Sequence, residues 1–230
     1  MDVETVGHGP QTIVALHGIQ GTRAVWRPVA LKLEADARFV LPNLRGRGRA
    51  LRSAGPQAHT LAHFAQDAAQ AIAAHVGDRS FVLAGWSMGV SVALEYVMRR
   101  AGPMPPALVL LSGTPALIQT RWFHKDGDAL RAEVAARERR LCLAQAADHD
   151  AVIDTWLAIR GGDHRPGLAS VDLPALVLHG ADDVESPPSH ATWLQHGLPN
   201  ARLVSFAGIG HNLPTDARDR VAEGIPGFVA

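Results

Sequence analysis

Residues 81–89 read Phe-Val-Leu-Ala-Gly-Trp-Ser-Met-Gly, an apolar stretch that runs straight into the pentapeptide Gly85-Trp86-Ser87-Met88-Gly89. Residues 90–100, which follow, have the composition of a helix. A strand, a Gly-x-Ser-x-Gly turn and a helix in this order predict a nucleophile elbow, in which a serine lies on a sharp turn at the end of a strand. Glycine is expected at positions 85 and 89 because Cβ atoms there would clash where strand and helix pack closely.

The apolar run that leads into this motif is one of several in the chain. Short apolar runs recur between Gly, Pro and Asn residues. Near-continuous apolar runs are typical of strands that are buried on both faces of a parallel sheet. We predict strands at 12–17, 39–42, 81–84, 107–111, 175–179 and 201–206, with a short edge strand at 3–6. Helices are predicted between them, at 24–35, 60–76, 87–100, 188–196 and 217–228. This alternation predicts an α/β fold with a doubly wound, mostly parallel sheet.

One interval breaks the alternation of strands and helices. The stretch between residues 111 and 175 is too long for a single crossover helix, and residues 128–146 and 150–159 within it have helical composition. We therefore expect residues 114–170 to form a small helical cap over the carboxyl ends of the strands. Residues 1–113 and 171–230 would then form the core domain.

Composition excludes several classes of function. The 230 residues carry 22 basic and 22 acidic side chains, so the net charge gives no reason to expect binding to nucleic acid or to an anionic membrane. No apolar run approaches the roughly 18 residues that span a bilayer. The acidic start lacks the basic and apolar regions of a signal peptide, and the single cysteine, Cys142, fits a reducing compartment. These features favour the cytoplasm.

The elbow serine needs partners to be reactive. A serine hydroxyl becomes a good nucleophile when a base takes its proton and a third group orients that base, and in this arrangement the three follow in the order serine, acid, histidine. The strand at 175–179 opens into a segment with three acids, Asp182, Asp183 and Glu185, and the strand at 201–206 leads to Gly210-His211. The N–H of Met88, at the start of a helix, is a candidate donor to an oxyanion.

Through these motifs and His17-Gly18, the whole chain resembles the α/β-hydrolase superfamily. The resemblance implies a Ser87–Asp183–His211 triad, because the acid of that family lies three residues after the strand's last glycine and four before a proline. Asp182 and Glu185 remain alternatives. The resemblance also implies that Ile19 supplies the second oxyanion N–H and that His17 supports its loop. Asn43 and Ala50 depart from the family, which usually has Asp and Ser at these loop positions.

Within the superfamily, the pentapeptide and a cap with basic residues resemble the esterases that remove the methyl group of pimeloyl-carrier-protein ester. The resemblance implies a serine esterase that forms an acyl-enzyme, on a small-molecule or carrier-bound ester. A thioesterase, a lactonase and a hydrolase of carbon–carbon bonds are alternatives on the same triad. A further alternative is a hydrolase-fold protein that binds a ligand without turnover.

Other residues have two readings each. Four aromatic side chains are candidates for the acyl pocket, with packing of the cap as the alternative for the last three: Trp86, Trp122, Phe123 and Trp156. Four arginines of the cap form either a solvated helix face or a docking face for an acidic carrier: Arg131, Arg137, Arg139 and Arg140. His59 and His63 could share a helix face, but two ligands do not make a metal site, so we expect no metal and no cofactor. The sequence gives no indication of the oligomeric state.

Overall fold

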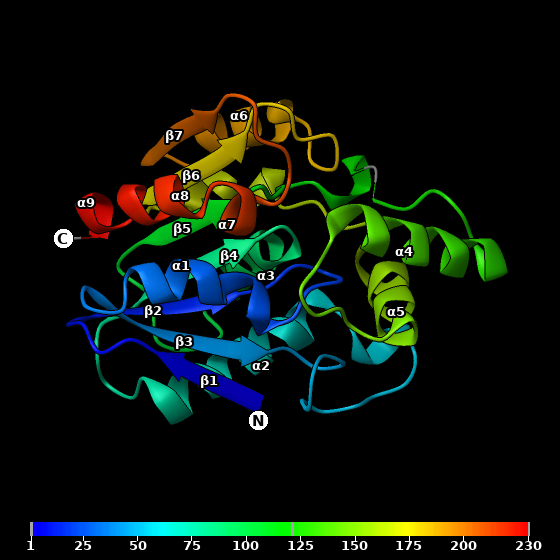
Figure 1. Ribbon diagram of the computed structural model, residues 1–230, viewed down its shortest axis with the longest axis horizontal. Helices are drawn as coiled ribbons and strands as arrows, with labels where there is room; N and C mark the ends of the chain where they lie inside the picture. The colour runs from blue at the N-terminus through cyan, green and yellow to red at the C-terminus, as the bar shows by residue number, and fades with distance from the viewer. Residues whose placement is uncertain (1, 121, 230) are drawn as a thin grey trace.

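The computed structural model describes residues 2–120 and 122–229, which form one seven-stranded sheet with helices on both of its faces (Figure 1). Met1, Arg121 and Ala230, which fall within the expected core and cap ranges, lie outside the described residues. The strand order is β1-β3-β2-β4-β5-β6-β7. The first strand runs antiparallel to β3, and the other neighbours are parallel. The predicted α/β fold class is confirmed.

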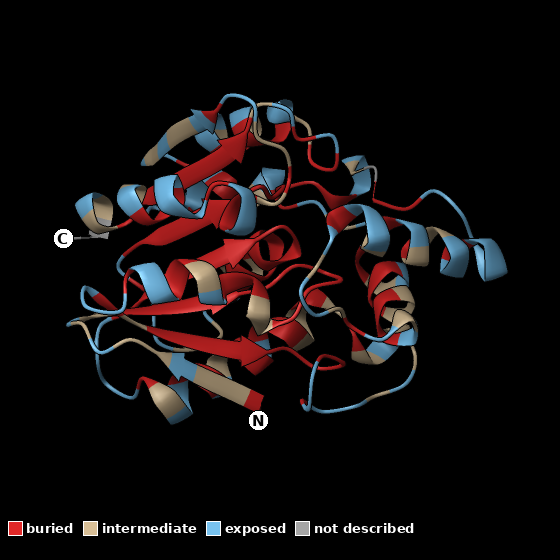
Figure 2. Cartoon of the chain, in the orientation of Figure 1, coloured by how far each residue is buried: buried red, intermediate tan, exposed pale blue. Residues whose placement is uncertain are grey.

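All seven predicted strands are present, with ends shifted by one or two residues at most. Their bounds are β1 Asp2–Val6, β2 Gln11–Leu16, β3 Ala37–Asn43, β4 Val82–Trp86, β5 Leu108–Leu111, β6 Ala175–Gly180 and β7 Ala201–Phe206. The central strands are almost completely buried, as their continuous apolar composition predicts, whereas the edge strand β7 is largely accessible (Figure 2). Apolar clusters fill the space between the sheet and the helices on each face.

Core helices lie where they were predicted, and proline explains two differences in their bounds. They are α1 Arg27–Lys32, α2 Leu61–His75, α3 Met88–Arg99, α6 Pro188–Gly197, α7 Leu213–Asp216, α8 Arg218–Gly224 and α9 Pro226–Val229. The segment predicted at 24–35 begins as a 3-10 turn, Arg23–Trp26, and its α-helix starts beside Pro28. The segment predicted at 217–228 is interrupted before Pro226, because proline has no N–H to continue the ladder. The short helix α7 was not predicted.

Two further helices, α4 (Gly127–Leu141) and α5 (His149–Ile159), pack against each other beyond the carboxyl ends of the parallel strands (Figure 1). The prediction of one helix over 128–146 was wrong at its end. Helix α4 stops at Leu141 because Cys142 takes a left-handed conformation, with φ of 47°. Short 3-10 turns complete the chain: Pro56–Ala58, Leu117–Gln119 and Arg165–Ser170. In the described ranges, no helix is both long enough and apolar enough to cross a membrane.

Candidate active site

Ser87 lies on a strained turn between β4 and α3. Its φ of 58° and ψ of −120° are unusual for a residue with a side chain, and such strain is common where a side chain must be presented for function. A Cβ at Gly85 would lie 2.3 Å from the carbonyl oxygen of Gly89, and one at Gly89 would lie 2.3 Å from that of Leu16. The need for glycine at both ends of the elbow is therefore confirmed.

The structure brings the elbow serine together with one histidine and one aspartate. His211 Nε2 lies 2.8 Å from Ser87 Oγ, and its Nδ1 lies 2.9 Å from Asp183 Oδ2. An ionised carboxylate can only accept, so Nδ1 carries the hydrogen and Nε2 is free to accept from the serine hydroxyl. This is the geometry in which a histidine can take the serine proton.

Asp183 is fixed independently of its histidine. Its Oδ1 accepts hydrogen bonds from the backbone N–H groups of Glu185 and Ser186, both at 2.9 Å. Burial by itself would raise the pKa of Asp183, but the charge and hydrogen bond of His211 and the N–H of Ser186 hold it below its usual range. The other two acids of the segment do not reach the histidine: Asp182 is exposed, and Glu185 binds arginines.

Trp86 supports the histidine from the strand side of the elbow. Its indole N–H donates to the carbonyl oxygen of His211 at 2.9 Å, and the two ring centroids lie 5.4 Å apart. The loop that carries His211 is thus tied to the strand that leads to Ser87. A contact between Trp86 and an acyl chain stays a prediction.

His17 holds the loop at the end of β2. Its Nε2 accepts from the N–H of Leu44 at 3.0 Å, so its Nδ1 must be the donor to the carbonyl oxygen of Gly18, at 2.9 Å. Burial, reinforced by the nearby charge of Arg47, lowers the pKa of His17 to about 3 and keeps the ring neutral. Because the carbonyl of Gly18 belongs to the same peptide group as the N–H of Ile19, His17 fixes the direction of that N–H.

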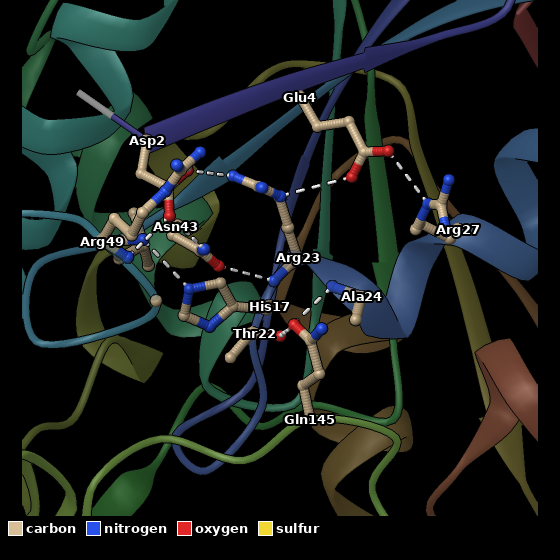
Figure 3. Close-up of polar contacts among 12 residues, drawn as sticks. Asp2, Glu4, His17, Thr22, Arg23, Ala24, Arg27, Asn43, Arg49 and Gln145 are labelled. Carbon is tan, nitrogen blue, oxygen red and sulfur yellow. Dashed lines mark hydrogen bonds and ion pairs between the residues drawn. The ribbon is translucent and has the colours of Figure 1, made fainter.

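The unusual Asn43 is explained by Asp2 (Figure 3). Asn43 donates from Nδ2 to Asp2 Oδ2 at 2.8 Å and accepts the N–H of Arg23 at its Oδ1, also at 2.8 Å. Asp2 additionally accepts from the N–H of Arg49 and pairs with the side chain of Arg23. Burial would raise the pKa of Asp2, but the hydrogen bonds from Asn43, Arg49 and Arg23 lower it to about 2. The carboxylate that position 43 lacks is supplied by β1.

Three aromatic candidates for the acyl pocket pack on one another. The ring of Trp156 lies 6.0 Å from that of Trp122 and 5.5 Å from that of Phe123, and all three side chains are buried. Trp156 and Phe123 also line a cavity of about 410 Å³ beside the turn Leu117–Gln119. Packing within the cap, the alternative reading, is therefore present, and contact with substrate stays a prediction.

The arginines of α4 do not form one face. Arg137 was expected on a solvated or docking face, and this was wrong: it is only 2% exposed, because its guanidinium donates to Glu185 and to Gln20. Arg140 and Arg131 are exposed and pair with Glu185 and Asp150. Arg139, also on α4, is exposed.

Two buried residues near the site were missed in the sequence. Arg47 is fully buried and donates to the carbonyl oxygen of Ile19 at 2.6 Å, and Gln20 joins the same loop to α4 through the carbonyl of Val134. The only signal for Arg47 was a charged residue placed between two glycines of a loop. Nothing in the local sequence marked Gln20.

The reacting side chains lie deep in the protein, since Ser87 is 1% exposed and His211 is 6% exposed. Within the described part of the chain, no group of three His, Cys, Asp or Glu residues is arranged to hold a metal ion.

Comparisons with known proteins show which chains this sequence is similar to. A model of the alpha/beta hydrolase family matches residues 13–224. A pimeloyl-[acyl-carrier protein] methyl ester esterase from Nitrosomonas europaea is 30% identical over an alignment of 243 positions, gaps included, that covers 91% of each chain. The AB hydrolase superfamily protein YisY from Bacillus subtilis is 27% identical and covers 98% of this chain and 94% of its own.

Solved structures share the same architecture. An esterase from Exiguobacterium antarcticum superposes with a TM-score of 0.79 at 21% identity, over 99% of this chain and 94% of that one. At this level of identity the likeness establishes the fold. The chemistry has to be read from the site itself.

Proposed function

The chain belongs to the alpha/beta hydrolase family and is an enzyme of the hydrolase class, and from there we propose that it cleaves a carboxylic ester through an acyl-enzyme on Ser87. One observation carries the proposal. His211 bridges the Ser87 hydroxyl at 2.8 Å and the Asp183 carboxylate at 2.9 Å, inside a buried site. This arrangement supports acyl transfer, since it joins a nucleophile, a base and the group that orients the base.

In the proposed first half-reaction, Ser87 Oγ attacks the ester carbonyl while His211 Nε2 takes the hydroxyl proton. Asp183 stabilises the imidazolium that forms. The same Nε2 then gives the proton to the departing alkoxide oxygen, which leaves as an alcohol. In the second half-reaction, water loses a proton to His211 and attacks the acyl-enzyme. His211 Nε2 then returns that proton to Ser87 Oγ as the bond to the acyl group breaks, and the acid product leaves.

The negative charge that develops on the carbonyl oxygen needs donors already in place. We assign them to the N–H groups of Ile19 and Met88. Met88 is the first residue of α3, so its N–H has no partner within the helix and lies at the positive end of the helix dipole. Each such donor contributes about 3–4 kcal/mol to stabilisation of the transition state.

We further propose that the ester is a methyl ester on an acyl chain held by a carrier protein. Support comes from the relative in Nitrosomonas europaea, which is named for that reaction. Exposed arginines on more than one side of α4 would contact the carrier, namely Arg131, Arg139 and Arg140. The cap at 114–170 would carry the acyl pocket, with Trp86, Trp122, Phe123 and Trp156 as its candidate lining. The single cysteine supports a cytoplasmic location for such an enzyme.

The experiment is turnover of a short p-nitrophenyl ester combined with labelling by a fluorophosphonate. We expect one adduct, at Ser87, and Ser87→Ala should lose both the adduct and turnover while its melting temperature stays near that of the unchanged protein. An adduct at another serine, or turnover that survives in Ser87→Ala, would contradict the mechanism. Absence of turnover with an intact triad would favour a ligand-binding protein.

A substrate panel then separates the esterase from its alternatives. Methyl esters, thioesters and lactones of matched acyl length are compared by kcat/KM in the unchanged protein. The proposal expects methyl esters to be preferred. A preference for thioesters or lactones would keep the triad mechanism and replace the proposed bond.

A further inference from the structure

The loop that carries Ile19 is bound to the cap through Gln20, Gly21 and Thr22. We call residues 17–22 the oxyanion loop. The carbonyl oxygen of Gln20 accepts the N–H of Ala147 at 2.8 Å, and the side chain of Gln20 donates to the carbonyl of Val134 in α4 at 2.9 Å. Gly21 forms an isolated antiparallel bridge with Ala146. These contacts pass from the core to the segment that carries α4 and α5, so the loop and that segment are one packed unit.

Arg47 joins the oxyanion loop to α5 from inside the protein. One Nη donates to the carbonyl of Ile19 at 2.6 Å, and the other donates to Thr155 Oγ1 in α5 at 3.0 Å. Among the described residues, no carboxylate is hydrogen-bonded to this guanidinium, although the charge of Asp67, which binds Arg45, acts on it from nearby. Burial of a cation without a directly bonded anion is costly, so a neutral side chain would pack at lower cost. We therefore attribute the role of Arg47 to its hydrogen-bond donors, which a neutral apolar side chain would lack.

Arg137 makes the corresponding link from α4. Its Nη1 donates to Gln20 Oε1 at 2.6 Å, and its Nε donates to Glu185 Oε2, also at 2.6 Å. The backbone N–H of Glu185 in turn donates to Asp183. One buried guanidinium thus connects α4 with both loops that flank the serine: the loop of the oxyanion donor and the loop of the acid.

We propose that Arg47 and Arg137 are positioning residues that hold the oxyanion loop against α4 and α5, so that the Ile19 N–H is in place only while the cap is closed over Ser87. The inference rests on the proposed ester hydrolysis. Ser87 is buried, and in this proposal substrate enters when the cap moves. Movement of α4 or α5 would break the contacts of Gln20, Arg47 and Arg137. Closure over a bound acyl chain restores them.

This role has a kinetic signature. An oxyanion donor binds charge that develops in the transition state, so its misplacement lowers kcat and leaves KM little changed. A residue that only stabilised the fold would lower the melting temperature and leave kcat of the folded fraction unaltered. The two roles are therefore separable by measurement.

The experiment compares Arg47→Met, Arg137→Met and Arg47→Lys with Arg52→Met. Arg52 is a matched control, since it also joins the core to the cap, through Asp148, but lies on the surface and does not contact the oxyanion loop. Steady-state kinetics on a small p-nitrophenyl ester are measured together with amide hydrogen exchange in peptides that cover residues 17–22 and 143–147. Melting temperatures show which fraction is folded.

We expect both methionine variants to lower kcat by about 10- to 100-fold, with KM little changed and faster exchange in both segments. Arg47→Lys should recover part of kcat, because one ammonium donor can still reach the Ile19 carbonyl. Arg52→Met should match the unchanged protein. Unaltered kcat, a rise in KM alone, or faster exchange in only one of the two segments would overturn the proposal.

Two further measurements keep the test decisive. Should Arg47→Met fail to fold, Thr155→Val removes a single partner of the guanidinium, and a smaller fall in kcat with faster exchange in both segments is expected. Unchanged kcat and exchange in that variant would overturn the proposal. Absence of turnover in the unchanged protein would count against the esterase, whereas the exchange data would still decide whether the loop and cap move as one unit.

Discussion

Glu185 accepts a hydrogen bond from Arg137 at 2.6 Å, and both side chains are almost completely buried. The carboxylate also binds Arg140, which is half exposed, at 2.5 Å. Burial would raise the pKa of Glu185, but the charge of Arg137 and the hydrogen bond from Arg140 hold it below its usual range. Loss of one partner of a buried ion pair destabilises the fold strongly, because the other partner is left as a buried charge without compensation.

Removal of one partner should therefore be severe. In Glu185→Gln, Arg137 is left as a buried cation without an anion, and we expect the free energy of unfolding to fall by about 3–5 kcal/mol. Urea unfolding followed by circular dichroism measures it. Arg140→Gln is the control on the same carboxylate, and because Arg140 is exposed it should cost less than about 1 kcal/mol. Equal losses in the two variants would contradict this account.

The acid of the proposed triad can be tested within one segment. Asp183→Asn should lower kcat by up to about 10⁴-fold, because an amide cannot stabilise the imidazolium or select the Nδ1–H tautomer of His211. Asp182→Asn, at the exposed neighbouring position, should leave kcat near that of the unchanged protein. Steady-state kinetics on a p-nitrophenyl ester decide between them. Reversal of the two effects would move the acid to Asp182.

The sequence was informative where a function needs a local backbone shape. The elbow at Ser87, the Gly-His turn at His211 and the acid segment at 180–187 are all readable because special backbone geometry restricts the residue types nearby. The strands were readable because buried parallel strands are continuously apolar. The fold class follows from these local patterns, whereas the selection of Asp183 and His211 came from the resemblance to a known family.

Contacts between distant segments were not readable. Helix α4 has a polar composition that favours a solvated face for Arg137, and only the approach of Gln20 and Glu185 from two other loops makes its burial possible. Likewise, Asn43 was only a departure from a pattern until the structure placed Asp2 beside it. The burial and hydrogen bonding of such side chains depend on tertiary partners, which the neighbouring residues in the sequence do not specify.

The Asp2–Asn43 pair permits a reciprocal exchange (Figure 3). Asn43→Asp alone should destabilise the protein by about 1–3 kcal/mol, since it removes a donor from Asp2 and brings two carboxylates together. Adding Asp2→Asn should recover most of this loss, because one carboxylate and one amide are again opposed. Chemical denaturation of the two single variants and the double variant measures the coupling. Additive losses would show that the pair does not interact.

Stability should decline on acidification before the carboxylates titrate. Burial lowers the pKa of His17 to about 3 and that of His190 to about 4, whereas both rings have a pKa near 6.5 in the unfolded chain. Above pH 6.5 neither state is protonated at these rings, so they contribute no pH dependence. Between pH 6.5 and 4 only the unfolded chain takes up these protons, which lowers the free energy of unfolding by up to about 1.4 kcal/mol per pH unit for each ring.

The measurement is urea unfolding at intervals from pH 7 to pH 4. In His190→Gln the slope against pH should become shallower, because one of the rings with a lowered pKa is removed. His8→Asn, at an exposed position, serves as the control. An equal slope in His190→Gln and in the unchanged protein would contradict the prediction.

The contacts of the oxyanion loop with the segment of α4 and α5 bear on protein engineering. Exchange of such segments between homologues is a natural way to build chimeras with new substrate ranges. Here the segment recognises the core through Gln20, Thr22 and Arg47, so a graft from a homologue would meet partners selected for different side chains. A chimera is expected to retain activity only when the residues at these three core positions are taken from the same homologue as the helices.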